Sequence, residues 1–298
     1  MVLVKINLQQ RTSTGRFAIR RQYSWKNAGC ISTDNLTDSP DPRRFQRCQL
    51  IDLHDKLVPY QQAWDFQRTL VDKCILDSEK GRFESHAAVI LQHPSVYTLG
   101  AGSTEDNILF DTEKSSIPLF RTERGGEVTY HGPGQLVLYP ILNLQRLGRA
   151  DLHEYMRSLE EVVIMALREV SGIQGGREPG LTGVWVDGQK VAAIGIRAKR
   201  WVTYHGLALN VTTDLTPFEA IVPCGISDRA VGSVKSLLLK GNRASGDSRA
   251  NVVQDDLELI TEYRYALLEA FQSVFGLELS VVHYGSQDQP ESLILESA

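Results

Sequence analysis

Two residues of the 298-residue chain have side chains and neighbours that suit nucleophilic chemistry, Cys224 and Lys190. Cys224 stands between Pro223 and Gly225, which indicates a constrained turn. Free cysteines are mostly buried and inert, but a turn cysteine beside a cation has a stabilised thiolate and acts as a nucleophile. Lys190 opens an otherwise apolar run. Lysines in strands are usually solvated, yet one in a poorly hydrated site can tune a neighbouring acid. The alternatives are that Cys224 is a buried, inert packing residue and that Lys190 is a solvated lysine at the edge of a strand.

A third feature is the segment 124–135, RGGEVTYHGPGQ, which contains four glycines. Glycine loses more chain entropy on folding than any other residue, so this density is typical of backbone that approaches a ligand or needs positive φ. The residues between the glycines carry hydrogen-bonding groups. The segment therefore predicts part of a binding site, with a glycine-rich connection between strands as the alternative.

Two histidines, His131 and His205, each follow a tyrosine and precede a glycine. Either could act as a general base or contact a ligand, although a lone histidine is more often structural. No carboxylate stands beside either one in the sequence. A Cys–His pair is therefore the competitor to a Cys–Lys pair.

Composition excludes several classes of protein. Hydrophobic residues make up 42% and charged residues 23%, as in ordinary globular proteins. The net charge of -4 gives no reason to expect nucleic acid, and no apolar run approaches the roughly 18 residues of a membrane span. The four cysteines form no C-x-x-C pair, which argues against a metal site. A complete phosphate-binding glycine motif is also missing, so no cofactor is predicted.

Periodicity and turn signals predict an α+β fold, because strands and helices do not alternate regularly. Helices are expected from Pro59, from Asp151 (with Glu154 in a capping-box position) and over 255–275. A hairpin is expected at Asp187-Gly188, a dipeptide that favours tight turns. Strands are expected from Cys48, over 87–92, near 117–122, over 135–142, along 201–211 and at 277–282, with a polar loop or insert at 240–251.

The first 49 residues hold nine Lys or Arg and three Asp, and residues 1–33 contain no acid. A basic, Ser-containing, acid-poor start is typical of a mitochondrial transit peptide, with a basic tail as the alternative. We expect a targeting segment and linker over 1–47, a catalytic domain over 48–285 and a tail over 286–298. The localisation expected is mitochondrial.

Taken together, four segments resemble the octanoyltransferase family of lipoate biosynthesis. They are 124–135, GQKVAAIG at 188–195, WVTYHGLALNV at 201–211 and IVPCGI at 221–226. The resemblance implies a mixed β-sheet packed with helices, as in the catalytic domain of biotin and lipoate protein ligases. It makes Cys224 and Lys190 the catalytic pair. It also implies a substrate site formed by Arg124, Gly125, Gly126, Glu127, Val128, Thr129, Tyr130, His131, Ala193, Ile194, Gly195, Gly206, Leu207 and Ala208.

The activity implied is transfer of an octanoyl group from octanoyl-acyl-carrier protein to a lysine of a lipoyl domain, through a thioester on Cys224. Acceptors would be the lipoyl domains of 2-oxoacid dehydrogenase complexes and the glycine cleavage H protein. Two alternatives stay open at this point. One is an ATP-dependent lipoate or biotin ligase on the same fold, and the other is a non-catalytic module that binds acylated domains. The docking surface for carrier protein would be local and basic, with Arg197, Lys199 and Arg200 as candidates.

Overall fold

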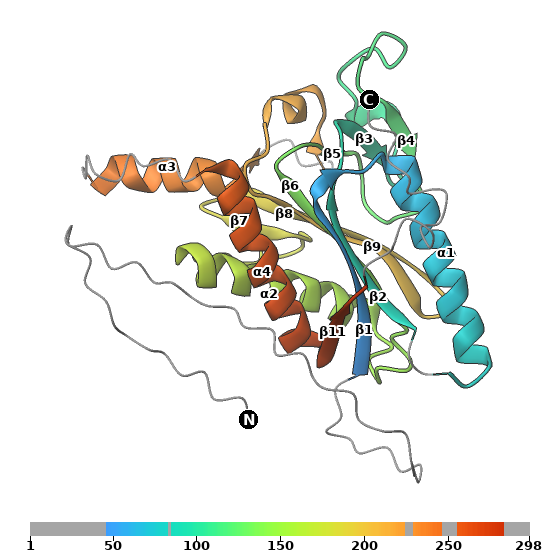
Figure 1. Ribbon diagram of the computed structural model, residues 1–298. Coiled ribbons are helices and arrows are strands. Elements are labelled where there is room, and N and C mark those ends of the chain that lie inside the picture. The colour runs from blue at the N-terminus through green and yellow to red at the C-terminus, as the bar shows by residue number, and fades with distance from the viewer. Residues whose placement is uncertain (1–45, 83–84, 224–228, 246–254, 283–298) are drawn as a thin grey trace, which may run out of the picture. The chain divides into compact units, whose positions relative to one another are not determined.

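The computed structural model describes residues 46–82, 85–223, 229–245 and 255–282, which belong to one compact unit built on a mixed sheet (Figure 1). In spatial order the strands are β10 (Ala230–Val231), β8 (Gln189–Lys199), β9 (Val202–Asn210), β6 (Gln135–Ile141), β2 (His86–Gln92), β1 (Gln46–Leu57) and β11 (Leu277–Val281), with β7 (Val184–Val186) paired to β8. Neighbouring strands are parallel at β10–β8, β2–β1 and β1–β11 and antiparallel at the other pairings. The α+β prediction is therefore confirmed.

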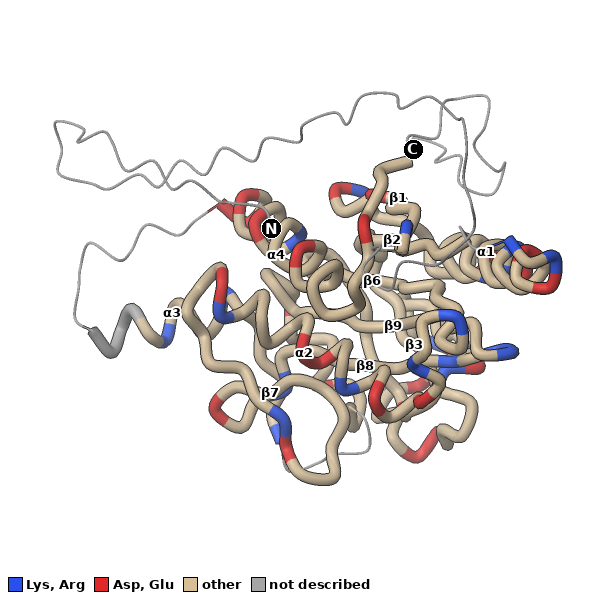
Figure 2. Tube along the Cα trace, turned by 90° about the horizontal axis from the view of Figure 1, so that it is seen from below, with Lys and Arg blue, Asp and Glu red and all other residues tan. Residues whose placement is uncertain are grey.

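Helices cover both faces of this sheet. Helix α1 (Tyr60–Glu79) packs on one face, and α2 (Leu152–Ser171) and α4 (Asp256–Phe275) pack side by side on the other. Figure 2 shows the strands between α1 and the other two helices. Strand β2 is buried along its whole length because its side chains alternate between the two cores. Ala88 and Ile90 face α2 and α4, whereas Val89 and Leu91 face α1.

Helix α2 begins where the sequence predicts. The Asp151 side chain accepts hydrogen bonds from the backbone N–H groups of His153 at 2.7 Å and Glu154 at 3.0 Å. These bonds satisfy donors that have no partner inside the helix. Gly172 ends the helix at φ 66°, a left-handed position that suits glycine. The 255–275 helix is also confirmed, with Asp255 as its N-cap.

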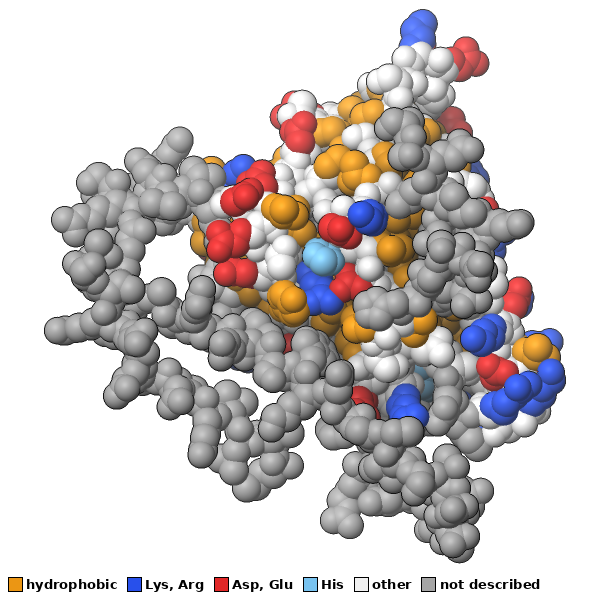
Figure 3. Space-filling model, in the orientation of Figure 1, with side chains coloured by type: hydrophobic (Ala, Val, Ile, Leu, Met, Phe, Trp, Pro, Cys, Tyr) orange, Lys and Arg blue, Asp and Glu red, His pale blue; other side chains and the backbone are white. Residues whose placement is uncertain are grey.

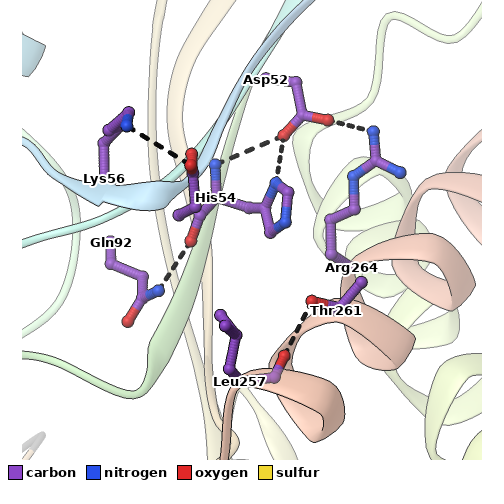
Figure 4. A network of polar contacts seen from close by, with 8 residues as sticks. Asp52, His54, Lys56, Gln92, Leu257, Thr261 and Arg264 are labelled. Atoms are coloured by element: carbon purple, nitrogen blue, oxygen red, sulfur yellow. Dashed lines mark hydrogen bonds and ion pairs between the residues drawn. The ribbon is translucent and has the colours of Figure 1, made fainter.

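A polar network joins α4 to the edge of the sheet. Asp52 on β1 accepts hydrogen bonds from Arg264 and from the His54 ring, the latter at 2.8 Å. Gln92 donates to the His54 carbonyl at 2.6 Å and accepts from the Gly134 backbone N–H at 2.7 Å. Figure 4 shows the Asp52, His54, Gln92 and Arg264 side chains. The network thereby links α4 to the glycine-rich turn after His131.

A smaller sheet lies beyond the end of the large one. It consists of β4 (Leu119–Arg121), β3 (Val96–Leu99) and β5 (Thr129–His131). Two short 3₁₀ helices, η1 (Glu105–Asn107) and η2 (Thr216–Ala220), complete this part of the chain. A separate hydrophobic cluster joins the small sheet to η2, with Tyr97, Tyr130 and Phe218 among its members.

Two sequence expectations differ from the structure. The first strand begins at Gln46 rather than Cys48, because Gln46 and Arg47 already pair with β11. Residues 240–245, expected in a loop, instead complete α3 (Val234–Ser245). Lys, Arg and Ala in that stretch are good helix formers and outweigh Gly241. The rest of the expected insert, the N-terminal segment to residue 45 and the expected tail lie outside the described residues. No helix in the described ranges is both long and apolar enough to cross a membrane.

Candidate active site

The β7–β8 hairpin places Lys190. Asp187 and Gly188 both have positive φ, 48° and 74°, and Val186 pairs with Gln189. This is the two-residue turn that the Asp-Gly dipeptide predicts. Strand β8 then runs antiparallel to β9, so that Gly195 lies opposite Gly206 and Ala193 opposite Ala208. The register therefore brings two predicted site segments, 193–195 and 206–208, side by side.

These two segments and much of the glycine-rich segment line one cavity, which we call the acyl cavity after the substrate that the family resemblance implies. Gly206 permits close packing here, because a Cβ at that position would lie 2.2 Å from the Leu138 carbonyl oxygen. The lining residues are Tyr60, Arg124, Gly126, Glu127, Thr129, His131, Val137, Tyr139, Ala193, Ile194, Gly195, His205, Gly206, Leu207 and Ala208.

Three residues that the family resemblance assigned to the substrate site do not line the acyl cavity. Val128 and Tyr130 point into the cluster that joins the small sheet to η2, because the alternation of β5 sends neighbouring side chains to opposite faces. Gly125 is exposed, and its N–H donates to the Ile196 carbonyl at 2.9 Å. Their contribution is to hold the segment in place.

Sequence reasoning missed three residues of the cavity wall, Tyr60, Val137 and Tyr139. Val137 and Tyr139 are two apart on β6, so both face α1. Tyr60 is the first residue of that helix, and its ring stacks on His131 with the centroids 6.0 Å apart. Strand alternation could have identified Val137 and Tyr139 together, but only the packing of α1 shows that Tyr60 joins them.

Arg124 ties the glycine-rich segment to the small sheet. Its guanidinium donates to the Thr98 carbonyl at 2.7 Å, to the Thr98 hydroxyl at 2.8 Å and to the Glu127 carbonyl at 2.9 Å. A planar guanidinium has several donors in a fixed geometry, which suits this bridging of backbone. Arg124 is buried while lining the acyl cavity. The residue thus shapes the cavity and also adds positive charge to it.

A second cavity adjoins the acyl cavity, because Thr129, Ala193 and Ala208 line both. Lys190 and Pro223 lie on its wall. Lys190 is buried, with 8% of its surface exposed, so the solvated-edge alternative is wrong. Pro223 directly precedes Cys224 in the chain. Cys224 itself lies outside the described residues. The other residues of this wall are Gln135, Asn210, Phe218 and Val231.

Comparison with known proteins gives this arrangement a family. Residues 59–247 match the lipoyl protein ligase A/B catalytic domain. Chloroplastic octanoyltransferase LIP2p2 of Arabidopsis thaliana is 48% identical over 254 residues, which are 85% of this chain and 88% of the relative. The chain belongs to the octanoyltransferase family. The octanoyltransferase of Nostoc punctiforme is also 48% identical, over 75% of this chain and 87% of its own.

The fold of this octanoyltransferase family member extends to more distant proteins. The structure of P. falciparum LipL1 in complex with lipoate aligns with a TM-score of 0.56 at 10% identity, covering 79% of this chain and 66% of that one. At this identity the likeness concerns the fold alone. The predicted mixed sheet packed with helices is thus shared with that protein. Membership of the octanoyltransferase family, shown by the relatives above, makes the chain an acyltransferase.

Two histidines on the wall of the acyl cavity, His131 and His205, are weak bases because they are buried. Burial lowers the pKa of His131 to about 3, and the charges of His93 and Arg124 act in the same direction. Burial, followed by the charge of Arg124, lowers the pKa of His205 to about 3. A general base works best when its pKa lies near the working pH. Both histidines therefore suit a role as neutral hydrogen-bonding groups better than one as a base.

A chain of contacts also reaches the backbone just before Cys224. The Glu127 carboxylate accepts hydrogen bonds from Ser103 at 2.6 Å and Asn107 at 3.2 Å. The Asn107 carbonyl in turn accepts from the Val222 N–H at 2.8 Å. Glu127 thus connects the wall of the acyl cavity to the segment that leads into Cys224.

The remaining cysteines and acids in the described part of the octanoyltransferase offer little rival chemistry. Cys48 and Cys74 are fully buried in the hydrophobic cores, and burial raises the pKa of both thiols. Buried thiols of this kind are inert. Among the described residues, no group of three or more His, Cys, Asp or Glu could hold a metal ion.

Two of the basic residues expected in a docking patch are already paired. Lys199 lies 2.9 Å from Asp72, and Arg200 contacts Glu79, both on α1. Figure 3 shows basic side chains gathered at the lower right, over the end of α1, with acidic side chains among them. Exposed pairs of this kind contribute little to stability and can exchange partners. They reduce the net positive field that an acidic partner would meet.

Proposed function

We propose that this enzyme transfers an octanoyl group from octanoyl-acyl-carrier protein to a lysine of a lipoyl domain, through a thioester on Cys224. One observation carries the proposal. Buried Lys190 and Pro223, the residue before Cys224, line one cavity, and that cavity adjoins the acyl cavity. A cation beside a cysteine favours its thiolate, which is the nucleophilic form.

In the first step the Cys224 thiolate attacks the thioester carbonyl of the donor. The bond from that carbonyl to the carrier's sulfur breaks, and the Lys190 ammonium group gives a proton to the leaving thiolate, which makes Lys190 a neutral amine. In the second step the ε-amine of the acceptor lysine attacks the new thioester. Lys190 takes a proton from this amine, an amide forms, and Cys224 leaves as a thiolate. One thioester replaces another and the amide is the more stable product, so no ATP is consumed.

The acyl cavity suits a medium aliphatic chain. Val137, Ala193, Ile194, Leu207 and Ala208 supply apolar wall. Burying each methylene of a chain against such a wall is worth about 0.8 kcal/mol. The polar groups of Arg124 and His131 lie on the same wall, and they would face the carbonyl end of the acyl group.

The Cys–Lys pair is favoured over the Cys–His pair on electrostatic grounds. Burial makes His131 and His205 poor proton acceptors, with pKa values of about 3. A lysine ammonium group supplies the positive charge that favours a neighbouring thiolate. The proposal for the ATP-dependent ligase would leave Cys224 without a role, because adenylation of a free acid needs no thiol nucleophile.

Intact-protein mass spectrometry tests the proposal. The enzyme is mixed with octanoyl-acyl-carrier protein without ATP, then with an isolated lipoyl domain. We expect an octanoyl adduct that hydroxylamine removes, that Cys224→Ala lacks, and that passes to the lipoyl domain. Labelling that appears only with ATP and free octanoate would contradict the proposal and identify a ligase. The lipoyl domain of a 2-oxoacid dehydrogenase complex and the glycine cleavage H protein are the acceptors to compare.

We further propose that residues 1–47 form an organellar targeting segment and linker, ahead of a catalytic domain over 48–285 and a tail over 286–298. The composition of the first 33 residues, basic and free of acids, supports this. The composition favours a mitochondrial destination, whereas the Arabidopsis relative is named as chloroplastic. A fluorescent protein fused after residue 47 distinguishes the two. Colocalisation with a mitochondrial marker supports targeting to mitochondria, fluorescence in plastids supports targeting but contradicts the mitochondrial destination, and fluorescence throughout the cytosol contradicts a targeting role.

A further inference from the structure

Glu160 on α2 is a fully buried carboxylate outside both cavities. Acids are almost never fully buried unless they are paired. One oxygen of Glu160, Oε2, accepts hydrogen bonds from Arg157 at 2.7 Å and Arg177 at 2.9 Å. The other oxygen, Oε1, accepts from the backbone N–H of Gly183 at 2.9 Å. Arg157 and Arg177 therefore hold the Glu160 carboxylate through Oε2, which leaves Oε1 to bind the Gly183 backbone.

That backbone position packs directly against Lys190. Gly183 has a φ of 125°, which side-chain-bearing residues rarely adopt. A Cβ at Gly183 would lie 2.5 Å from Cε of Lys190 and 2.6 Å from the Ala192 carbonyl oxygen. The Gly183 backbone is thus in contact with the end of the lysine side chain, and any shift of Gly183 shifts the space that Cε occupies.

Other groups bound the same lysine. Its Nζ lies 5.6 Å from the ring centroid of Trp185, within the range of a cation–π contact. The Arg229 guanidinium lies 5.9 Å from the same centroid and 3.7 Å from Glu178. The Lys190 carbonyl accepts from the Gly232 N–H at 2.9 Å, which anchors the backbone. With the backbone anchored, the packing of the methylenes is one of the contacts that set where Nζ lies.

We propose that Glu160 is a positioning residue for Lys190, acting through Gly183. By holding Gly183 against Cε, it fixes where the ammonium group lies in the cavity shared with Pro223. The inference rests on the proposed function, in which that ammonium group stabilises the Cys224 thiolate. If Glu160 served stability alone, it would only hold α2 to the chain before β7. Its substitution would then leave the reactivity of Cys224 unchanged.

Matched substitutions separate these roles. Glu160→Asp keeps the charge for the two arginines but withdraws the oxygen from Gly183. Glu161→Asp is its control, because Glu161 also accepts from Arg177, at 2.7 Å, whereas the Gly183 N–H donates to Glu160. Gly183→Ala crowds Cε directly. Gly180→Ala is the control there, since Gly180 has a φ of 76° and a Cβ at that position would have nothing within 4 Å. Lys190→Ala sets the reference for a missing cation.

The readout is the pH midpoint for alkylation of Cys224 by iodoacetamide, followed on its own peptide by mass spectrometry, with circular dichroism to confirm folding. We expect Lys190→Ala to move the midpoint up toward the free-thiol value of about 8.5. Glu160→Asp and Gly183→Ala should each raise the pH midpoint by at least half as much as Lys190→Ala does, while both control variants should keep the parent midpoint.

A folded Glu160→Asp protein with the parent midpoint would overturn the inference. If Glu160→Asp does not fold, a folded Gly183→Ala protein with the parent midpoint would overturn the inference. Failure of the proposed function looks different. In that case Lys190→Ala itself leaves the midpoint unchanged, or the parent enzyme forms no octanoyl adduct on Cys224.

Discussion

Gln135 accepts a hydrogen bond from Nδ1 of His131 at 2.6 Å, and this contact decides which nitrogen of the ring carries its proton. The amide nitrogen of Gln135 donates to the Tyr130 carbonyl at 3.2 Å and to Asn210 Oδ1 at 2.8 Å. A carbonyl only accepts, so the Gln135 oxygen must face the histidine. Neutral His131 is therefore protonated on Nδ1, and Nε2 is left as an acceptor.

Replacing Gln135 tests this arrangement. Gln135→Leu removes the acceptor for His131 and the donor for Asn210, leaving buried polar groups without these partners. We expect a loss of about 1–3 kcal/mol in the free energy of unfolding. Urea titration measures it, and ¹⁵N NMR of the histidine ring should report the Nδ1-protonated tautomer in the parent protein. An Nε2-protonated tautomer there would contradict the assignment.

A close approach of two loops makes Gly100 intolerant of a side chain. A Cβ at Gly100 would lie 1.6 Å from the Gly126 carbonyl oxygen, which belongs to the wall of the acyl cavity. Gly100→Ala must displace that backbone, so we expect a loss of stability of about 3 kcal/mol or more together with loss of transfer activity. Gly102→Ala is the control, because nothing lies within 4 Å of its Cβ position. Equal melting temperatures for the two variants would refute the prediction.

Four buried histidines predict acid sensitivity. Burial lowers the pKa of His86 and His93 to about 4, and that of His131 and His205 to about 3. The unfolded chain, with a histidine pKa near 6.5, binds more protons than the folded protein between those values. Their contribution to stability is therefore present above about pH 6.5 and is lost as the pH falls toward 4 and 3.

The variant His93→Gln isolates one of these groups. The His93 ring forms hydrogen bonds with the Val58 carbonyl at 2.6 Å and the Tyr139 hydroxyl at 2.7 Å. A glutamine amide can replace these two bonds in part. Between pH 6 and 5 we expect the slope of unfolding free energy against pH to fall by about 1.2 kcal/mol per unit. Urea titrations at several pH values measure that slope, and His153→Gln on exposed surface is the control. An unchanged slope would mean that His93 is protonated in the folded protein.

The Asp52–Arg264 pair carries a different pH dependence. Burial alone would raise the pKa of Asp52, but hydrogen bonds and charges from His54 and Arg264 lower it to about 2. This stabilisation is present above the unfolded value of about 3.9 and is lost as the pH falls toward 2. Arg264→Met should cost about 3 kcal/mol, because it leaves a half-buried carboxylate short of a partner. It should also raise the Asp52 pKa, which NMR titration of the carboxyl carbon measures; a value unchanged from the parent would contradict this account.

Local sequence determined the elements that carry their own signals. Asp187-Gly188 predicts the hairpin before Lys190, because two residues that tolerate positive φ form the turn that matches strand twist. Asp151 predicts the start of α2 through its cap. The resemblance of four segments to a known family indicated the fold and the acyl chemistry. Helix α3 is not predicted from the sequence, since polar helix formers and loop residues have similar compositions.

Tertiary structure decided where those residues lie relative to one another. Nothing near Lys190 in the sequence shows that it is buried, because its environment comes from Gly183, from β10 and from the pairing of β8 with β9. Nor does any local pattern connect Glu160, 30 residues before Lys190 in the printed sequence, to that lysine. Strand register and helix packing set such distances through contacts between segments far apart in the chain, which periodicity along a single segment does not encode.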